Sequence, residues 1–137
     1  MKTQLVLLLT QDPQFKTLLS ETLLGDGGSL AVKSAMSDAF QMVCSRGHEL
    51  DLVVLDFDEG CHGMTLLSAI KNCRDDLPII VATSGDVYHA AAVAYANGVD
   101  ACLAKPVSAA ELRRVVTQTL RKHCWVSSHD HSGTNPR

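Results

Sequence analysis

DLVVLDFDEG, at residues 51–60, is the most informative segment of this sequence. Its apolar run from Leu52 to Leu55 does not alternate with polar residues, and it ends abruptly at Asp56. Such a run is typical of a strand that is buried on both faces in the middle of a parallel sheet. Functional groups gather beyond the carboxyl ends of strands in open α/β sheets, so Asp56 lies where a site is expected. The alternative is an aspartate that only caps a helix or solvates a loop.

The composition indicates a single globular domain. The chain has 137 residues, of which 46% are hydrophobic and 20% are charged, enough for a sizeable core. The net charge of −3 and the aromatic content of 4% argue against direct contact with nucleic acid. Five cysteines without a C-x-x-C pair favour a reduced, cytoplasmic setting. No segment approaches the ~20 apolar residues of a membrane span, so no membrane association is expected.

Four further apolar runs surround the central strand, with helical patterns between them. Strands are predicted at residues 5–9, 30–33, 78–82 and 101–103. Helices are predicted between Pro13 and Gly25 and at residues 36–45, 64–73, 86–97 and 108–122. Five successive βα units predict an α/β fold with a doubly wound parallel sheet, because short right-handed crossovers place helices on both faces.

The predicted strand ends deliver polar groups to one edge of this sheet. They are Thr10, Gln11 and Asp12 after the first strand, Asp56 after the third, Thr83 after the fourth and Lys105 after the fifth. This set favours phosphoryl transfer to a carboxylate. Asp56 is the expected nucleophile and phosphoacceptor, Lys105 would neutralise phosphoryl oxygens, and Thr83 would donate its hydroxyl to one of them. Ser84 is small enough to leave room for the incoming group.

In this order and spacing the motifs resemble the receiver domain of two-component response regulators. The matching segments are DLVVLD, PIIVATS, GVDACLAKP and SAAEL, so the resemblance covers roughly residues 4–122. It implies a flavodoxin-like (βα)5 domain with strand order 2-1-3-4-5, which we place at residues 1–122. Residues 123–137 lack apolar periodicity, and we expect them to form a disordered C-terminal tail or the start of a linker.

The resemblance also implies a function in phosphorelay signal transduction. A receiver accepts a phosphoryl group from a histidine kinase or a histidine phosphotransfer protein, with magnesium (Mg²⁺) held by acidic residues. It is not an enzyme beyond assisting its own phosphorylation and dephosphorylation. The threonine and an aromatic residue on the fifth strand then shift, which alters the surface of helix four, strand five and helix five. That surface is expected to bind an output protein or a second copy of the chain.

The sequence departs from the family at the metal site. The family's acidic pair after the first strand falls on Thr10 and Gln11, which are both neutral. Mg²⁺ prefers charged oxygens, so we expect its affinity to be weakened and its absence is an alternative. The candidate metal ligands are Asp56, Asp58, Gln11 and Asp12. Glu59 is another possible replacement carboxylate, while a helix N-cap competes for Asp12.

The loop after Asp56 and the switch position differ as well. Gly60 stands where the family has proline, Gly63 comes one residue earlier than the usual glycine, and Cys102 replaces the strand-five aromatic. A cysteine cannot move a bulky ring between buried and exposed positions. The chain is therefore either an atypical working receiver or a phosphorylation-independent pseudo-receiver that serves as a constitutive interaction module. Retention of Asp56 with its threonine and lysine favours the first, although Lys105 could also pair with Asp56 and hold the site closed.

The predicted helix at residues 86–97 is unusually rich in alanine and carries no Lys, Arg or Glu between its ends. Tyr88 and Tyr95 lie on it, and together with Thr83 and Cys102 they are our candidate switch or output residues. Alanine is the best helix former, so the helix could simply present a harmless surface. It could equally form a docking or dimer face, and the sequence leaves the two interpretations open.

Overall fold

The computed structural model describes residues 4–25, 27–58 and 63–131, with side chains up to Arg121. The strands are β1 (Leu5–Leu9), β2 (Ser29–Lys33), β3 (Leu52–Asp56), β4 (Ile79–Thr83) and β5 (Ala101–Ala104). The helices are α1 (Pro13–Gly25), α2 (Met36–Arg46), the short 3₁₀ helix η1 (Gly47–Glu49), α3 (Gly63–Cys73), α4 (Val87–Ala96) and α5 (Ala109–His131). Strands and helices thus alternate along the described ranges, as predicted.

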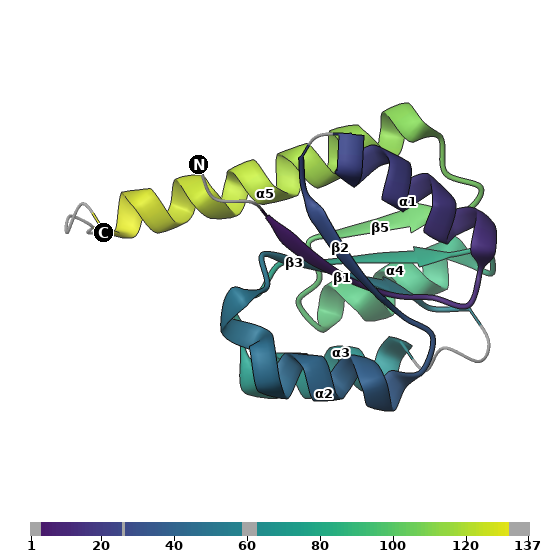
Figure 1. Cartoon of the computed structure of the whole chain (residues 1–137). Coiled ribbons are helices and arrows are strands. Elements are labelled where there is room, and N and C mark those ends of the chain that lie inside the picture. Colours follow the sequence, from purple (N-terminus) through teal and green to yellow (C-terminus); the bar gives the residue numbers. More distant parts are fainter. Residues whose placement is uncertain (1–3, 26, 59–62, 132–137) are drawn as a thin grey trace.

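The strands form one parallel sheet in the order β2-β1-β3-β4-β5, which confirms the predicted topology (Figure 1). β3 lies in the middle, and all of its residues are buried. Its side chains alternate between two apolar layers, which explains why the sequence shows an unbroken run rather than a period of two.

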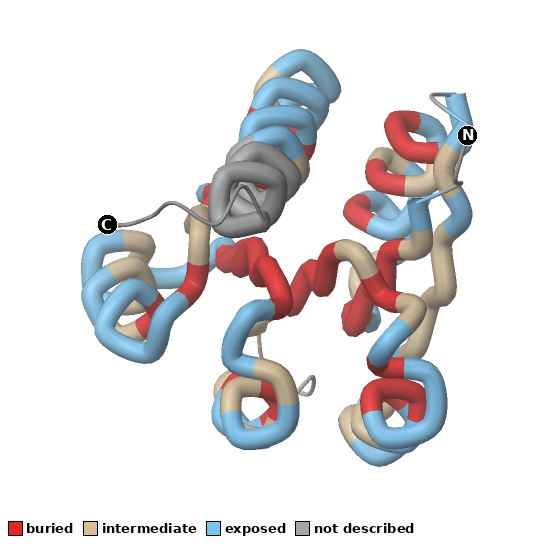
Figure 2. The backbone as a smooth tube through the Cα atoms, turned by 90° about the vertical axis from the view of Figure 1, so that its left-hand side faces the viewer, coloured by how far each residue is buried: buried red, intermediate tan, exposed pale blue. Residues whose placement is uncertain are grey.

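Helices cover both faces of the sheet. Val6, Leu8 and Val54 pack with α1 and α5, whereas Leu7 and Val53 pack with α2, α3 and α4. Figure 2 shows the buried strand residues, in red, between these two layers of helices. The core is therefore divided by the sheet, and the strand ends are left at its two edges.

Two aspartates satisfy backbone groups at the amino-terminal edge of the sheet. Asp51, directly before β3, accepts the N–H of Leu5 at 2.8 Å, and Asp100, directly before β5, accepts the N–H of Ile79 at 2.9 Å. Each carboxylate thus pairs with the first N–H of a neighbouring strand, which would otherwise lack a ladder partner. These contacts fix the start of β1 and β4 and leave the opposite, carboxyl edge for a site.

The helix starts follow the sequence, but the end of α5 does not. Ser108 Oγ accepts the N–H of Glu111 at 3.0 Å, as its capping position predicts. The helix was expected to end near Lys122, yet it continues to His131. Residues 123–131 contain neither glycine nor proline, so nothing in the backbone chemistry stops the helix there. No helix in the described ranges is both long and apolar enough to cross a membrane.

Candidate functional site

The carboxyl edge of the sheet brings Asp56 and Lys105 into direct contact. Asp56 ends the buried strand β3, and Lys105 directly follows β5. The Lys105 Nζ lies 2.7 Å from Asp56 Oδ2. Thr10, directly after β1, donates its hydroxyl to the same oxygen at 2.6 Å. Thr10 and Lys105 each lie almost fifty positions from Asp56 in the sequence, and both contact its carboxylate.

Asp56 is deeply buried, with a relative exposure of 1%. Besides the two donors on Oδ2, its Oδ1 accepts the N–H of Asp58 at 2.8 Å. A buried carboxylate is costly unless it is paired and hydrogen-bonded, and both conditions are met here. The charge of Asp56 is thus held in place by groups from three different loops.

Lys105 contacts two further carboxylates. Its Nζ lies 2.9 Å from Asp58 Oδ2 and 3.1 Å from Asp12 Oδ2, and it stands 5.1 Å from the centre of the Phe15 ring. Burial alone would lower the pKa of Lys105, but the hydrogen bonds to Asp56, Asp58 and Asp12 outweigh it and raise the pKa above its usual value. The side chain is a charged ammonium across the physiological pH range.

Asp58 is anchored to the end of β4. Ser84 donates its backbone N–H to Asp58 Oδ1 at 2.8 Å and its hydroxyl to Oδ2 at 3.0 Å. The Thr83 hydroxyl lies 3.3 Å from Oδ1, so it faces Asp58. Burial raises the pKa of Asp58, but the Ser84 N–H and Lys105 more than compensate, and the net result is a lowered pKa. Ser84, expected to leave open space, instead holds a carboxylate.

Asp12 caps α1 and also turns one oxygen inward to Lys105. Its Oδ1 accepts the N–H groups of Gln14 at 2.9 Å and Phe15 at 3.3 Å, which caps α1, while Oδ2 contacts Lys105. Burial raises the pKa of Asp12, but these hydrogen bonds and the Lys105 charge leave the pKa below its ordinary value. The two oxygens of one carboxylate make the double role possible.

The other candidate ligands are not gathered at this point. Gln11 is exposed, and its Nε2 donates to the carbonyl oxygen of Ser34 at 3.0 Å. It takes no part in the contacts around Asp56 described above. Glu59 and Gly60 lie outside the described residues.

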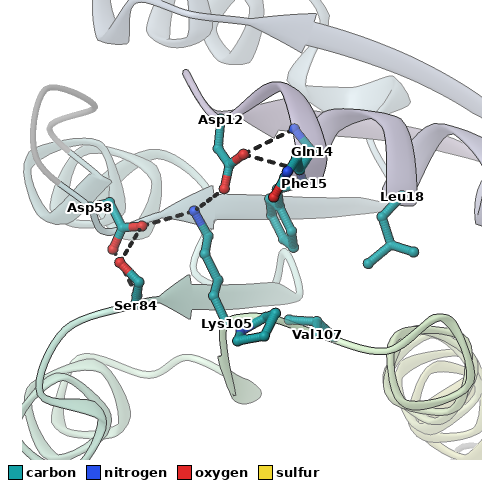
Figure 3. Close-up of a pocket in the computed structure, with 9 residues that line it drawn as sticks. Asp12, Gln14, Phe15, Leu18, Asp58, Ser84, Lys105 and Val107 are labelled. Carbon is teal, nitrogen blue, oxygen red and sulfur yellow. Dashed lines mark hydrogen bonds and ion pairs between the residues drawn. The ribbon is translucent and has the colours of Figure 1, made fainter.

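A pocket of about 440 Å³ opens beside the cluster formed by Lys105 and the carboxylates of Asp12, Asp56 and Asp58 (Figure 3). Its lining residues are Asp12, Gln14, Phe15, Leu18, Asp58, Ser84, Lys105, Pro106 and Val107. One end is charged, and the other is apolar because α1 and the segment after β5 face each other there. The bond between Thr10 and Asp56 and the apolar wall of the pocket were not predicted from the sequence.

Gly63 allows α3 to approach the site closely. A Cβ at this position would lie 2.7 Å from the carbonyl oxygen of Asp56 and 2.7 Å from the Phe57 ring. Only a residue without a side chain avoids that overlap. The early glycine noted in the sequence is therefore explained by packing against the phosphoacceptor candidate's own backbone.

Three of the candidate switch residues lie on α4 and β5, whereas Thr83 ends β4. The Tyr95 hydroxyl accepts the N–H of Cys102 at 3.2 Å, while Tyr88 is 90% exposed. Ala94 is the buried residue of α4. Cys102 is partly buried, and burial raises the pKa of its thiol. A ring from α4 thus covers part of the strand on which the expected aromatic is missing.

Comparison with known proteins agrees with this geometry. The model of the response regulator receiver domain matches residues 6–117. The chain belongs to this family. No curated protein matches the sequence significantly.

Solved receiver structures have the same fold. A response regulator receiver domain protein from Clostridium thermocellum superposes with a TM-score of 0.81 at 19% identity, covering 90% of this chain and 98% of that one. A CheY-like receiver protein from Methanospirillum hungatei gives 0.80 at 16%, covering 89% and 97%. NtrX from Brucella abortus gives 0.84 at 21%; 93% of this chain matches only 29% of that longer protein. At these identities the likeness shows the fold alone.

Membership of the family places the chain among the receiver domains of two-component signalling. Receiver domains are in general signal domains rather than enzymes. They interact with kinases or phosphotransfer proteins and with output domains, and they generally bind Mg²⁺ in their acidic pocket.

The arrangement of side chains here does not fit a resident Mg²⁺. The carboxylates of Asp12, Asp56 and Asp58 are oxygen ligands of the right kind, but all three point at the Lys105 ammonium. Within the described residues, no group of three or more His, Cys, Asp or Glu side chains has the geometry of a metal site. As the residues lie, a lysine charge occupies the place that a cation would need.

Proposed function

We propose that this receiver takes part in a phosphorelay, with Asp56 accepting a phosphoryl group from a histidine kinase or a histidine phosphotransfer protein. The observation that carries the proposal is the contact between the buried Asp56 and Lys105, 2.7 Å apart. A carboxylate nucleophile next to a fixed ammonium suits the formation of an acyl phosphate, because the ammonium offsets charge on the phosphoryl oxygens.

In the proposed step, an oxygen of Asp56 attacks the phosphorus atom of a phosphohistidine. The P–N bond breaks as the new P–O bond forms, and the imidazole keeps the bonding electron pair and takes up a proton. Lys105 offsets charge on the phosphoryl oxygens as a positive point charge, and the Thr83 hydroxyl donates to one of them. In a separate step, water attacks the phosphorus atom of the acyl phosphate and the P–O bond to Asp56 breaks, which returns the free carboxylate and inorganic phosphate.

Phosphorylation would then alter a protein-binding surface on α4, β5 and α5. Thr83 ends β4 and is the residue through which a new phosphoryl charge would act on that surface. Cys102 lacks a ring, so Tyr95, which contacts its N–H, and the exposed Tyr88 are the aromatic groups available there. An output protein or a second copy of the chain is the expected occupant, in the cytoplasm and without direct contact to nucleic acid.

A pseudo-receiver is the second candidate, and a specific observation favours it. Lys105 contacts Asp12, Asp56 and Asp58 together in a closed cluster. If that cluster never opens, the fold acts as a constitutive interaction module. Weakened dependence on Mg²⁺ would be the corresponding property of a working but atypical receiver.

Incubation with acetyl phosphate and Mg²⁺, followed by intact mass measurement, separates the two candidates. The phosphorelay proposal expects one added phosphoryl group in the wild-type protein and none in Asp56→Asn. Asp75→Asn, at an exposed aspartate far along the chain from the site, should still be modified. An unmodified wild-type protein that still binds its partner would instead support the pseudo-receiver.

A further inference from the structure

The carboxylate of Asp58 makes an unusually complete set of contacts. Its oxygens accept hydrogen bonds from the Lys105 ammonium at 2.9 Å, the Ser84 hydroxyl at 3.0 Å and the Ser84 N–H at 2.8 Å. The Thr83 hydroxyl adds a longer contact at 3.3 Å. These donors come from the ends of β4 and β5, whereas Asp58 follows β3, so the carboxylate bridges three strand ends (Figure 3).

The donors around Asp58 constitute an anion site. An ammonium, two hydroxyls and a backbone N–H converge on it, and nothing in that set is particular to a carboxylate. An oxyanion of the phosphate class would use the same donors, because charge-assisted hydrogen bonds of this kind suit carboxylate and phosphate oxygens alike. Thr83 and Lys105 are also the groups that the proposed function assigns to the phosphoryl oxygens.

We propose that Asp58 is an internal occupant of this oxyanion site, and that phosphate or a phosphoryl group enters only when the Asp58 carboxylate leaves. Two anions cannot share one set of donors at contact distance without strong repulsion. The site adjoins the acceptor, because the Asp58 N–H is bonded to Asp56 Oδ1 at 2.8 Å. That a phosphoryl group is the physiological ligand of this site rests on the proposed function. That Asp58 occupies the site does not.

The exposure of the side chains makes this exchange feasible. The Asp58 side chain is 27% exposed, whereas that of Asp56 is only 1% exposed. Asp58 borders the pocket and can turn from its donors into water, where a carboxylate is well solvated. Asp56 has no such route, so it stays in place as the acceptor while its neighbour moves.

Asp12 provides a matched comparison within the same cluster. It contacts the same ammonium at 3.1 Å and carries the same charge, but its other oxygen caps α1 and it is not bonded to Ser84. Removing the charge of Asp12 therefore changes the local electrostatics without vacating the oxyanion site. Asparagine at this position keeps the helix cap, because Asn is as good an N-cap as Asp.

The test is a titration with inorganic phosphate in metal-free buffer containing a chelator, followed by the amide NMR signal of Ser84. Asp58→Ala should bind phosphate at least about tenfold more tightly than the wild type, because the competing hydrogen bonds are lost. Asp58→Asn should gain less, since its amide still fills the site. Asp12→Asn should gain less than Asp58→Asn, with the Ser84 signal still reporting the occupied site.

Two results would overturn the inference. One is a gain in Asp12→Asn as large as that in the Asp58 variants, because charge alone would then explain the binding. The other is the absence of a saturable Ser84 shift in Asp58→Ala. If that variant does not fold, the comparison of Asp58→Asn with Asp12→Asn decides between the same outcomes.

Acetyl phosphate separates this inference from the proposed function. If Asp56 is the acceptor, Asp58→Ala should be phosphorylated faster than the wild type. Phosphate binding to Asp58→Ala without any covalent adduct in either protein would leave the inference intact and refute the phosphorelay. An adduct that forms equally fast in both, with no phosphate binding, would refute the inference and leave the phosphorelay intact.

Discussion

Lys105 is the residue through which three carboxylates are held in one small volume. It supplies one positive charge to Asp12, Asp56 and Asp58, so the cluster as a whole keeps a negative charge. The side chain of Lys105 is only 7% exposed, so its ammonium is shielded from water. The stability of this arrangement depends on that shielding and on the fixed position of the ammonium. Each residue of the cluster is therefore expected to contribute to the stability of the fold.

The stabilising effect of Asp58 should depend on pH in a defined window. Its folded pKa lies below the ordinary value of 3.8, so the stabilisation is complete above about pH 4 and is lost as the pH falls through the lowered folded pKa. The pKa of Lys105 is raised above 10.5, so its share is lost only as the pH rises through that raised value. Asp58→Asn should cost about 1 kcal/mol between about pH 5 and 9, and less below about pH 4.

Urea unfolding of the wild type and Asp58→Asn across this range, followed by far-UV circular dichroism, measures the effect. Asp75→Asn at an exposed position is the control and should change the free energy of unfolding little. A difference between wild type and Asp58→Asn that stays the same at pH 3 would contradict the assigned contacts.

Thr10 should matter for stability because its hydroxyl serves two partners. It donates to Asp56 at 2.6 Å and accepts the N–H of Asp12 at 3.0 Å, and the residue is only 3% exposed. Thr10→Val keeps the shape but removes both contacts, and we expect a loss of about 1–3 kcal/mol in the free energy of unfolding. Thr10→Ser retains the hydroxyl and should lose less; an equal loss in both variants would assign the effect to packing instead.

At the scale of elements, the site depends on how closely α3 approaches the end of β3. A Cβ at position 63 would overlap the Asp56 carbonyl oxygen and the Phe57 ring. The Asp56 oxygen belongs to the backbone of β3 and cannot turn away as a side chain can, so the helix itself has to move. The position of α3 is therefore coupled directly to the end of β3, although no side chain of α3 belongs to the site.

Gly63→Ala should lower the free energy of unfolding by about 1–3 kcal/mol, because overpacking against fixed atoms forces a shift of the helix. Gly25→Ala, at the end of α1, is the matched control. A Cβ there meets nothing within 4 Å, so that variant should be neutral or slightly stabilising. Thermal unfolding of both variants provides the measurement, and equal midpoints would show that α3 adjusts without cost.

The elements themselves could be predicted from the sequence, and the reason lies in their patterns. The run of Leu52 to Leu55 fits a strand buried on both faces, and a parallel sheet with short crossovers leaves few possible strand orders. The convergence of Asp56 and Lys105 could be predicted as well, because the carboxyl ends of parallel strands share one edge of the sheet. The extension of α5 did not follow, because polar residues without apolar spacing were interpreted as a tail.

The finer arrangement of the site could not be predicted, because it depends on how individual side chains turn. The side chain of Gln11 donates to the carbonyl oxygen of Ser34 instead of pointing to Asp56. The sequence does not show which way this side chain turns. Asp58 was a candidate metal ligand, but its position among the donors of Ser84 and Lys105 is visible only in three dimensions. The role of Thr10 was missed for a related reason: its place at the carboxyl edge of the sheet was predicted, but its bond to Asp56 depends on how its side chain turns.

At the scale of the whole molecule, the exposed apolar residues are unevenly placed. Tyr88 on α4 is 90% exposed and Tyr95 is 52% exposed, on the side of the molecule where β5 forms the edge of the sheet. Leu24, at the end of α1, is 59% exposed and lies on another helix. The first two belong to the proposed output surface, while the third offers a comparison outside it.

Tyr88→Ala should weaken association through α4 without affecting folding. The free energy of unfolding should stay within about 0.5 kcal/mol of the wild type, because so exposed a ring loses little packing. Sedimentation equilibrium after treatment with acetyl phosphate tests whether a dimer forms and whether the variant reduces it. Leu24→Ala should leave any dimer unchanged; an equal effect in both variants would place the contact elsewhere.

The length of α5 has a mechanical consequence. Its 23 residues extend over roughly 35 Å, about twice the span of any strand in the sheet. Leu112, Val115 and Val116 are buried in its first turns, while the ribbon of its later turns projects past the sheet (Figure 1). Only the first half of α5 is held against the sheet, so a tilt there moves the projecting half. A tilt of about 5° displaces the far end of the helix by roughly 1–2 Å, given the rise per residue. A small tilt of the buried part of α5, next to Lys105, would thus produce a larger displacement at the far end of the helix.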